Sequence, residues 1–168
     1  MAQTHVHRGT YQSIPDDASP GLLFLRAILP ALDSLGPFKG TPELATYLAP
    51  NATFIINNGA PVEASQVLGM LEMRASKLTS FEHVVQSAWD VDNGNGSRTV
   101  MYESASVTVF AEDKEGVQVR IREFNIIELA ASSDGKGIHG LHAVQLRAYL
   151  DGSPVTERAT AMMAVAKQ

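Results

Sequence analysis

The second half of the sequence contains four long runs in which apolar and polar residues alternate as they do in β-strands. The runs cover residues 81–92, 98–111, 117–131 and 137–150, and the connectors between them are rich in Gly, Asn and Asp. Such connectors supply the positive backbone φ angles that tight antiparallel hairpins require. The pattern predicts an antiparallel sheet of four long strands, which must twist and curl and must have one face covered.

The residues before this sheet supply the material that covers it. An apolar helix is predicted to begin after Ser19, with Pro20 in its first turn and Pro30 kinking or dividing it. A short helix follows Thr41, and a longer amphipathic helix spans residues 62–78. A short strand, ATFIINN, separates these last two helices.

Both ends of the chain are also interpreted from their composition. Residues 1–19 are polar and contain prolines, so they are predicted to form a flexible tail ahead of a single domain at 20–168. The C-terminal run TERATAMMAVAK is predicted to be a helix, with a last short strand as the alternative.

Composition excludes several classes of function. Thirteen basic against eighteen acidic residues give a net charge of -5, which argues against a nucleic-acid-binding protein. The absence of cysteine excludes disulfides, thiolate nucleophiles and Cys-ligated metals. No apolar run is long enough to span a membrane, and the N-terminus has no signal-peptide pattern, so a cytoplasmic location is expected.

The order of elements and three local motifs resemble the NTF2-like superfamily. The motifs are Leu48–Phe54 (LAPNATF), Asn58–Pro61 (NGAP), and Glu123–Asn125 with the later Asp134-Gly135-Lys136. The chain is most similar to SnoaL-like and ketosteroid-isomerase-like proteins over about residues 20 to 150. The resemblance implies an α+β fold, a cone-shaped barrel in which three N-terminal helices pack on a curved, mainly antiparallel sheet.

Strand parity predicts which side chains face the hollow of such a barrel. A two-residue turn at Gly94-Asn95 places Ser87 opposite Tyr102, and one at Asp113-Lys114 places Tyr102 opposite Asn125. A slip of one residue would put Glu103 in the place of Tyr102. A turn at Asp134-Gly135 pairs Ile127 with His142. The side chains predicted to face the cavity include His83, Ser87, Trp89, Tyr102, Glu123, Asn125 and His142.

Glu123 is the most informative of these residues because a carboxylate on an apolar face must be paired or must have a raised pKa. A Glu of raised pKa is a natural general acid or base, and His83 titrates close to neutral pH. Glu123 and His83 are therefore the predicted proton-transfer groups. The alternative is that Glu123 is a structural hydrogen-bond partner of Tyr102, Arg26 or Arg74.

Tyr102 and Asn125 are the predicted donors to a developing negative oxygen, because a hydroxyl and an amide can both stabilise an enolate. In ketosteroid-isomerase-like proteins an acidic donor stands at the position of Asn125. The catalytic aspartate of that group falls at or near Ile56, so its standard reaction is disfavoured. The predicted substrate-binding residues are Trp89, Ser87, His142, Ser104, Phe54 and Asn58.

The resemblance implies a cofactor-independent isomerase, cyclase or dehydratase that acts on a hydrophobic cyclic metabolite, such as a polyketide or terpenoid intermediate. The alternative is a non-catalytic ligand-binding or dimerisation module. No metal site is expected, since no HxH or HxxxH spacing brings His83, His142 and Glu123 together, and His139 and His142, three apart on a strand, point to opposite faces. A homodimer is predicted to form through the outer face of the sheet, whose apolar residues are Met101, Ala105, Val107, Val109, Phe124 and Ile126.

Overall fold

The computed structural model describes residues 3–36, 43–132 and 137–165. In chain order the elements are β1 (Thr4–Arg8), the 3₁₀ turn η1 (Tyr11–Ser13), α1 (Pro20–Asp33), the 3₁₀ turn η2 (Leu44–Tyr47), β2 (Leu48–Ile56), β3 (Val62–Glu63), α2 (Ala64–Ala75), β4 (Leu78–Asp92), β5 (Arg98–Phe110), β6 (Val119–Ala131), β7 (Leu141–Leu150) and α3 (Ser153–Val165).

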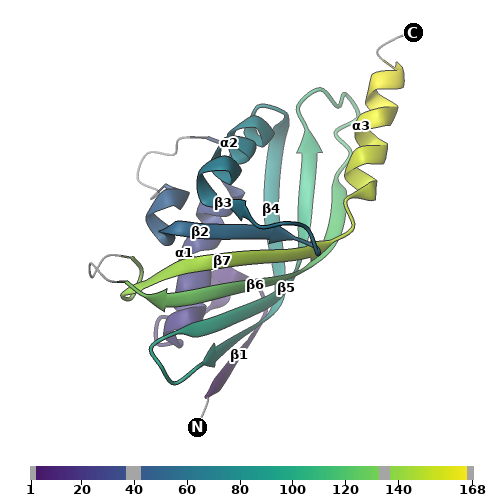
Figure 1. The fold of residues 1–168 in the computed structure, drawn as a ribbon. Helices are drawn as coiled ribbons and strands as arrows, with labels where there is room; N and C mark the ends of the chain where they lie inside the picture. Colours follow the sequence, from purple (N-terminus) through teal and green to yellow (C-terminus); the bar gives the residue numbers. More distant parts are fainter. Residues whose placement is uncertain (1–2, 37–42, 133–136, 166–168) are drawn as a thin grey trace.

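The strands form one curved sheet in the order β1-β4-β5-β6-β7-β2-β3 (Figure 1). Neighbouring strands are antiparallel except β2 and β7, which are parallel. The four long strands predicted from the sequence correspond to β4, β5, β6 and β7. The fold is therefore α+β with a mainly antiparallel curved sheet, as predicted.

Helix α1 supplies most of the cover on the sheet. It packs on β4 and β5, while α2 packs on β2. Nine residues of α1 are buried, and four of them are completely inaccessible to solvent: Phe24, Leu25, Ile28 and Leu29. The helix begins after Ser19 as predicted and continues through Pro30 without being divided. An almost wholly apolar helix is stable here because both its sheet-facing side and its flanks are covered.

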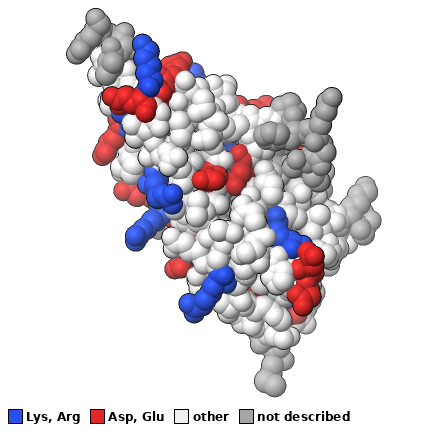
Figure 2. Space-filling model, turned by 180° about the vertical axis from the view of Figure 1, so that it is seen from behind, with Lys and Arg blue, Asp and Glu red and all other residues white. Residues whose placement is uncertain are grey.

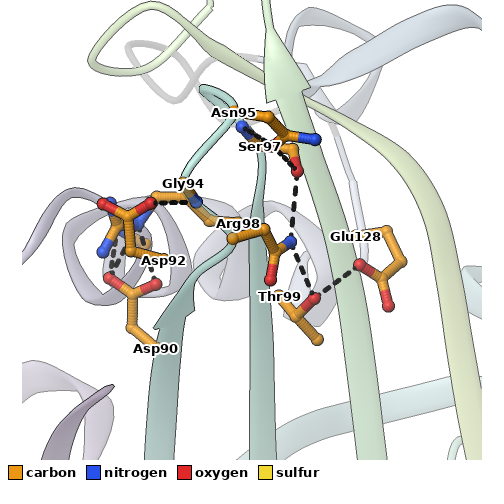
Figure 3. Close-up of polar contacts among 10 residues, drawn as sticks. Asp90, Asp92, Gly94, Asn95, Ser97, Arg98, Thr99 and Glu128 are labelled. Carbon is orange, nitrogen blue, oxygen red and sulfur yellow. Dashed lines mark hydrogen bonds and ion pairs between the residues drawn. The ribbon is translucent and has the colours of Figure 1, made fainter. Parts of the chain in front are cut away.

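The first turn of α1 is held to the sheet by a buried ion pair. Asp90 on β4 is completely buried, and its Oδ2 accepts a hydrogen bond of 2.9 Å from the Gly21 backbone N–H. Arg98 donates from Nε to Asp90 Oδ1 at 2.8 Å and from Nη1 to Asp92 Oδ2 at 2.9 Å (Figure 3). A Cβ on Gly21 would lie 2.3 Å from Asp90 Oδ1, so the contact requires glycine.

Two expectations about the N-terminal half are corrected. Residues 4–8 form the edge strand β1 instead of part of a flexible tail, with Thr4 opposite Val91 and Arg8 opposite Ser87. The strand forms because the long β4 would otherwise expose a row of unpaired backbone groups. The arrangement of three N-terminal helices is not found either: the second is the short turn η2, and the start predicted for it at Thr41 lies outside the described residues.

The C-terminal helix is confirmed as α3, and an ion-pair cluster fixes it to the β5–β6 connector. Arg158 donates from Nε to Asp113 Oδ2 at 2.9 Å and from Nη2 to Glu115 Oε2 at 2.7 Å. None of the side chains of α3 that the structure describes is buried, and that of Met163 is 61% exposed. The described contacts that attach α3 are therefore this ion-pair cluster and a set of half-buried side chains.

We predict that Asp90→Asn destabilises the fold by about 3–5 kcal/mol, because it leaves the buried Arg98 guanidinium without its charge partner. Equilibrium unfolding in urea measures the loss. Asp92→Asn is the matched control: Asp92 binds the same Arg98, but its side chain is 41% exposed, so its loss should be much smaller. Equal losses for the two variants would contradict the anchoring role of Asp90.

Candidate active site

A cavity of about 480 Å³ lies between the two N-terminal α-helices and the concave face of the sheet. This volume is within the usual range for small-molecule sites. Its lining is mostly apolar and includes Leu32, Phe54, Val67, Leu71, Ile127 and Leu146. The polar side chains that border it are few: His83, Tyr102, Glu123, Asn125 and Arg74, whereas the side chain of Arg147, which is also in the lining, points to the other face of the sheet. The hollow is therefore suited to a largely apolar molecule with a small number of polar atoms.

His83 lies between two carboxylates that come from different elements. Its Nδ1 contacts Asp33 Oδ1 at the end of α1, and its backbone N–H donates to Asp33 Oδ2 at 3.1 Å. Its Nε2 lies 3.4 Å from Glu123 Oε2 on β6. A neutral imidazole has one donor and one acceptor nitrogen, so a ring that faces a carboxylate on both sides is satisfied as the imidazolium.

The electrostatics agree with this geometry. Burial opposes the charged form of His83, but hydrogen bonds to Asp33 and Glu123 outweigh burial and raise its pKa to about 9. Burial also opposes ionisation of Glu123, yet the contact with His83 lowers the Glu123 pKa below its ordinary value. Of the two possibilities predicted for this buried carboxylate, the structure shows pairing, and a raised pKa is not found.

Asn125 and Tyr102 complete the polar end of the cavity. The Asn125 side-chain amide donates to Ser104 Oγ at 3.2 Å and to Glu123 Oε2 at 3.4 Å. Both amide hydrogens are thus engaged in orienting other side chains. The Tyr102 hydroxyl has no hydrogen-bond partner within the described ranges, and burial, followed by the charges of Glu123 and Asp33, raises its pKa. Tyr102 therefore retains its proton and can donate it in a hydrogen bond to a ligand.

Arg74 is a second cation beside the cavity, and it approaches from α2. Its Nη2 donates to the Leu32 carbonyl at 2.6 Å, and its guanidinium carbon lies 3.9 Å from the centre of the Phe81 ring. The Phe81 ring in turn meets the His83 ring edge to face at 5.1 Å. Burial lowers the pKa of Arg74, whereas the charges of Asp33 and Glu123 raise it.

Asp33 was not predicted to be a site residue, and Arg74 was predicted only as a possible structural partner of Glu123. The sequence contains a feature that points to each of these two residues. Asp33 is the only acidic residue of α1 and ends that mostly apolar helix, and Arg74 shares the helical spacing of Val67, Met70 and Leu71. A charge on an apolar stripe indicates either a snorkelling side chain or a buried partner. The proposed bond from Glu123 to Arg26 is not formed, because Arg26 binds the Ile14 carbonyl and Asp16 instead.

Two predicted pocket residues, Ser87 and Trp89, face away from the cavity. The pairing of β4 with β5 shifts by one residue between Val85 and Ser87, so the strand contains a bulge there. Ser87 consequently pairs with Glu103, and Trp89 pairs with Met101, on the face opposite Tyr102. Tyr102 itself faces inward and pairs with Asn125 as predicted. A bulge inverts the parity of every later residue in its strand, which a simple turn count does not include.

Of the other residues predicted to bind the substrate, some lie at the cavity and others do not. Phe54 borders the cavity, and Ser104 is buried behind Asn125. His142 pairs with Ala130 instead of Ile127, since the backbone bond from Ser132 N–H to the Gly140 carbonyl closes a longer connector than the predicted two-residue turn. The Asp134-Gly135 pair that was to form this turn lies outside the described residues.

Asn58 also does not border the cavity. It is exposed in the turn between β2 and β3, and its neighbours Gly59 and Ala60 line the cavity instead. In the part of the chain that the structure describes, no three His, Asp or Glu side chains are arranged to hold a metal ion.

Several solved structures have the same fold. BvnE pinacolase from Penicillium brevicompactum is 11% identical, with a TM-score of 0.59 over 87% of this chain and 95% of that one. Hexachlorocyclohexane dehydrochlorinase LinA-type3 from Novosphingobium barchaimii LL02 is 10% identical, with a TM-score of 0.58 over 76% of this chain and 82% of that one. An NTF2-like protein of unknown function from Exiguobacterium sp. 255-15 is 16% identical, with a TM-score of 0.53 over 76% and 98%.

These comparisons confirm the predicted NTF2-like architecture as a likeness of fold. No family model matches the sequence, and no curated protein has a similar sequence. None of the described helices is both long and apolar enough to cross a membrane. On the face shown in Figure 2, the described Lys and Arg side chains are scattered between uncharged areas and form no continuous basic surface.

We predict that His83 keeps its proton up to about pH 9 in the folded protein. An unperturbed His titrates at about pH 6.5. Because the folded-state pKa is the higher one, the resulting stabilisation is fully present below about pH 6.5 and disappears as the pH rises through about 9. NMR titration of the imidazole signals measures the midpoint directly. Asp33→Asn should lower it and the remote Asp16→Asn should not, while a wild-type midpoint near 6.5 would contradict the prediction.

Proposed function

We propose that this chain, which has the NTF2-like fold, is a cofactor-independent enzyme that performs acid–base chemistry on a hydrophobic small molecule in this cavity. The reaction classes that suit the site are elimination, as in a dehydratase, and proton-transfer isomerisation or cyclisation. The observation that carries the proposal is the placement of His83 between Asp33 and Glu123 at the polar end of an apolar hollow.

The two paired groups have complementary roles in an elimination. Glu123 is ionised at neutral pH and removes a proton from a carbon next to a carbonyl group. The carbon–oxygen bond on the neighbouring carbon breaks as the double bond forms. His83 donates its Nε2 proton to the departing oxygen, which leaves as water.

The same geometry restores the site after each turnover. Glu123 then carries the proton taken from carbon, and His83 is neutral. The separation of 3.4 Å between Oε2 and Nε2 lets this proton pass back to the imidazole. Asp33 remains bound to Nδ1 throughout, fixing the orientation of the ring and favouring the imidazolium. The cycle therefore needs no redox cofactor.

Tyr102 is the donor that stabilises the developing enolate oxygen in this proposal. Tyr102 lines the cavity and its hydroxyl keeps its proton, whereas the amide of Asn125 is engaged with Glu123 and Ser104. Asn125 thus positions Glu123 and does not itself bind the oxyanion. This divides the two roles that the sequence analysis assigned jointly to these residues.

A β-hydroxy ketone that bears a bicyclic aromatic ring tests the activity, because its dehydration gives a conjugated enone whose absorbance can be followed. We expect His83→Gln and Glu123→Gln each to lower kcat/KM at least about 100-fold. Trp89→Phe and His142→Gln are matched controls outside the cavity and should stay within about threefold. Wild-type rates in both site variants, or no turnover by the wild type, would contradict the proposal.

A ligand-binding module without catalysis is the second candidate. It is supported by the mutual satisfaction of Glu123, Asn125 and Ser104, which suits a rigid binding wall as well as an active site. Trp89 and Phe110 do not line the cavity, which argues against a purely structural or dimerisation module and leaves ligand binding as the form of this candidate. Saturable ligand binding with no turnover distinguishes this function from the enzyme.

We keep homodimerisation through the outer face of the sheet as a proposal. The apolar residues predicted on that face are less exposed than expected: Ala105 and Val107 are buried, and Met101, Val109, Phe124 and Ile126 are half-buried. A partly covered apolar face still favours association with a second copy. Light scattering after gel filtration should give twice the chain mass of 18.0 kDa, and a monomer mass would contradict the dimer.

A further inference from the structure

The charged groups beside the cavity balance one another. Two carboxylates, Asp33 and Glu123, face one imidazolium, His83, and the guanidinium of Arg74 lies beside them. We propose that Arg74 completes a charge-balanced quartet with these three residues, and that this balance makes the cavity select uncharged ligands over carboxylates of the same shape. The inference deepens the proposed function and rests on it, because both place the ligand in the same cavity.

The count of charges follows from hydrogen-bonding geometry. His83 presents one ring nitrogen to each carboxylate, and both nitrogens donate only when the ring is positively charged. Asp33, His83 and Glu123 alone therefore carry one net negative charge in a mostly apolar enclosure. Arg74 is always protonated, so it brings the sum to zero.

Arg74 is fixed in a position where it balances charge without quenching the carboxylates. Its Nη2 is bound to the Leu32 carbonyl, and its planar group packs on the Phe81 ring. It forms no ion pair with a described acidic residue, and its buried Nε has no hydrogen-bond partner there. The influence of Arg74 on Asp33 and Glu123 is therefore exerted through space, which leaves a Glu123 oxygen able to accept a proton.

Charge balance determines which ligands are compatible with the cavity. A carboxylate ligand would add an uncompensated negative charge among apolar side chains, where screening is weak. Arg147 does not compensate this charge, because its side chain lies on the other face of the sheet, where it donates to Tyr149 Oη and Gln145 Oε1. An uncharged ligand with a ketone or hydroxyl oxygen meets no such penalty and can accept a hydrogen bond from Tyr102.

Two probes of nearly equal shape test the inference by calorimetry at neutral pH: 2-acetylnaphthalene, which is uncharged, and 2-naphthoate. We expect the wild type to bind the ketone at least about tenfold more tightly than the carboxylate.

Glu123→Gln gives the quartet a net positive charge. It should therefore tighten the binding of 2-naphthoate about tenfold, while the affinity for the ketone changes less than about threefold. Arg74→Met should widen the preference for the ketone, and Arg74→Lys, which keeps the charge, should preserve it.

Arg26→Met is the matched control, because Arg26 lies on α1 but binds Asp16 and the Ile14 carbonyl away from the cavity. It should leave the ratio of the two affinities unchanged. The inference is overturned if the wild type binds 2-naphthoate as tightly as the ketone, if Glu123→Gln does not change the ratio, or if neither probe binds at about 1 mM. Because these are binding ratios, they can fail while elimination activity persists, or hold while turnover is absent.

Discussion

The contact between Asp90 and the first turn of α1 is the constraint on which the rest of the structure depends. Asp90 lies on β4 and binds the Gly21 N–H, while the last residue of the same helix is Asp33, which contacts His83 on the same strand. A straight helix of this length spans about 20 Å. The helix is therefore a rigid spacer fixed to β4 at both ends, and its buried apolar side chains prevent it from rotating. Movement at Asp90 would displace the carboxylate that orients the imidazole.

The polar end of the cavity is stable because its charged groups come from four different elements and balance one another. Asp33 comes from α1, Arg74 from α2, His83 from β4 and Glu123 from β6. Burying any one of them alone would be costly, since a charge removed from water requires pairing or neutralisation. The site thus depends on the complete packing of helices on the sheet, and an isolated hairpin could not form it. This dependence connects the stability of the core directly to the protonation state of His83.

Much of the fold could be predicted from local patterns, and the errors have identifiable physical causes. The four long strands, α1 and the inward direction of Tyr102 follow from alternation, capping residues and turn composition. The errors at Ser87, Trp89 and His142 come from a bulge and a longer connector, which shift register without a marked change in residue type. Asp33 was missed because its role depends on a contact fifty positions along the chain, which no local pattern contains.

The bulge at Gln86 lets a single strand serve two separate tasks. Before it, His83 and Val85 lie on the helix-covered face of the sheet; after it, Ala88 and Asp90 do so, although an unbroken alternation would have turned Asp90 toward the outside. If the same residues paired without the bulge, the bulky indole of Trp89 would turn toward α1 and the Asp90 carboxylate that holds the helix would turn outward. This strand is thus constrained in its phase as much as in its residues: an insertion or deletion elsewhere between His83 and Asp90 keeps both side chains on the helix-covered face only if the bulge changes with it.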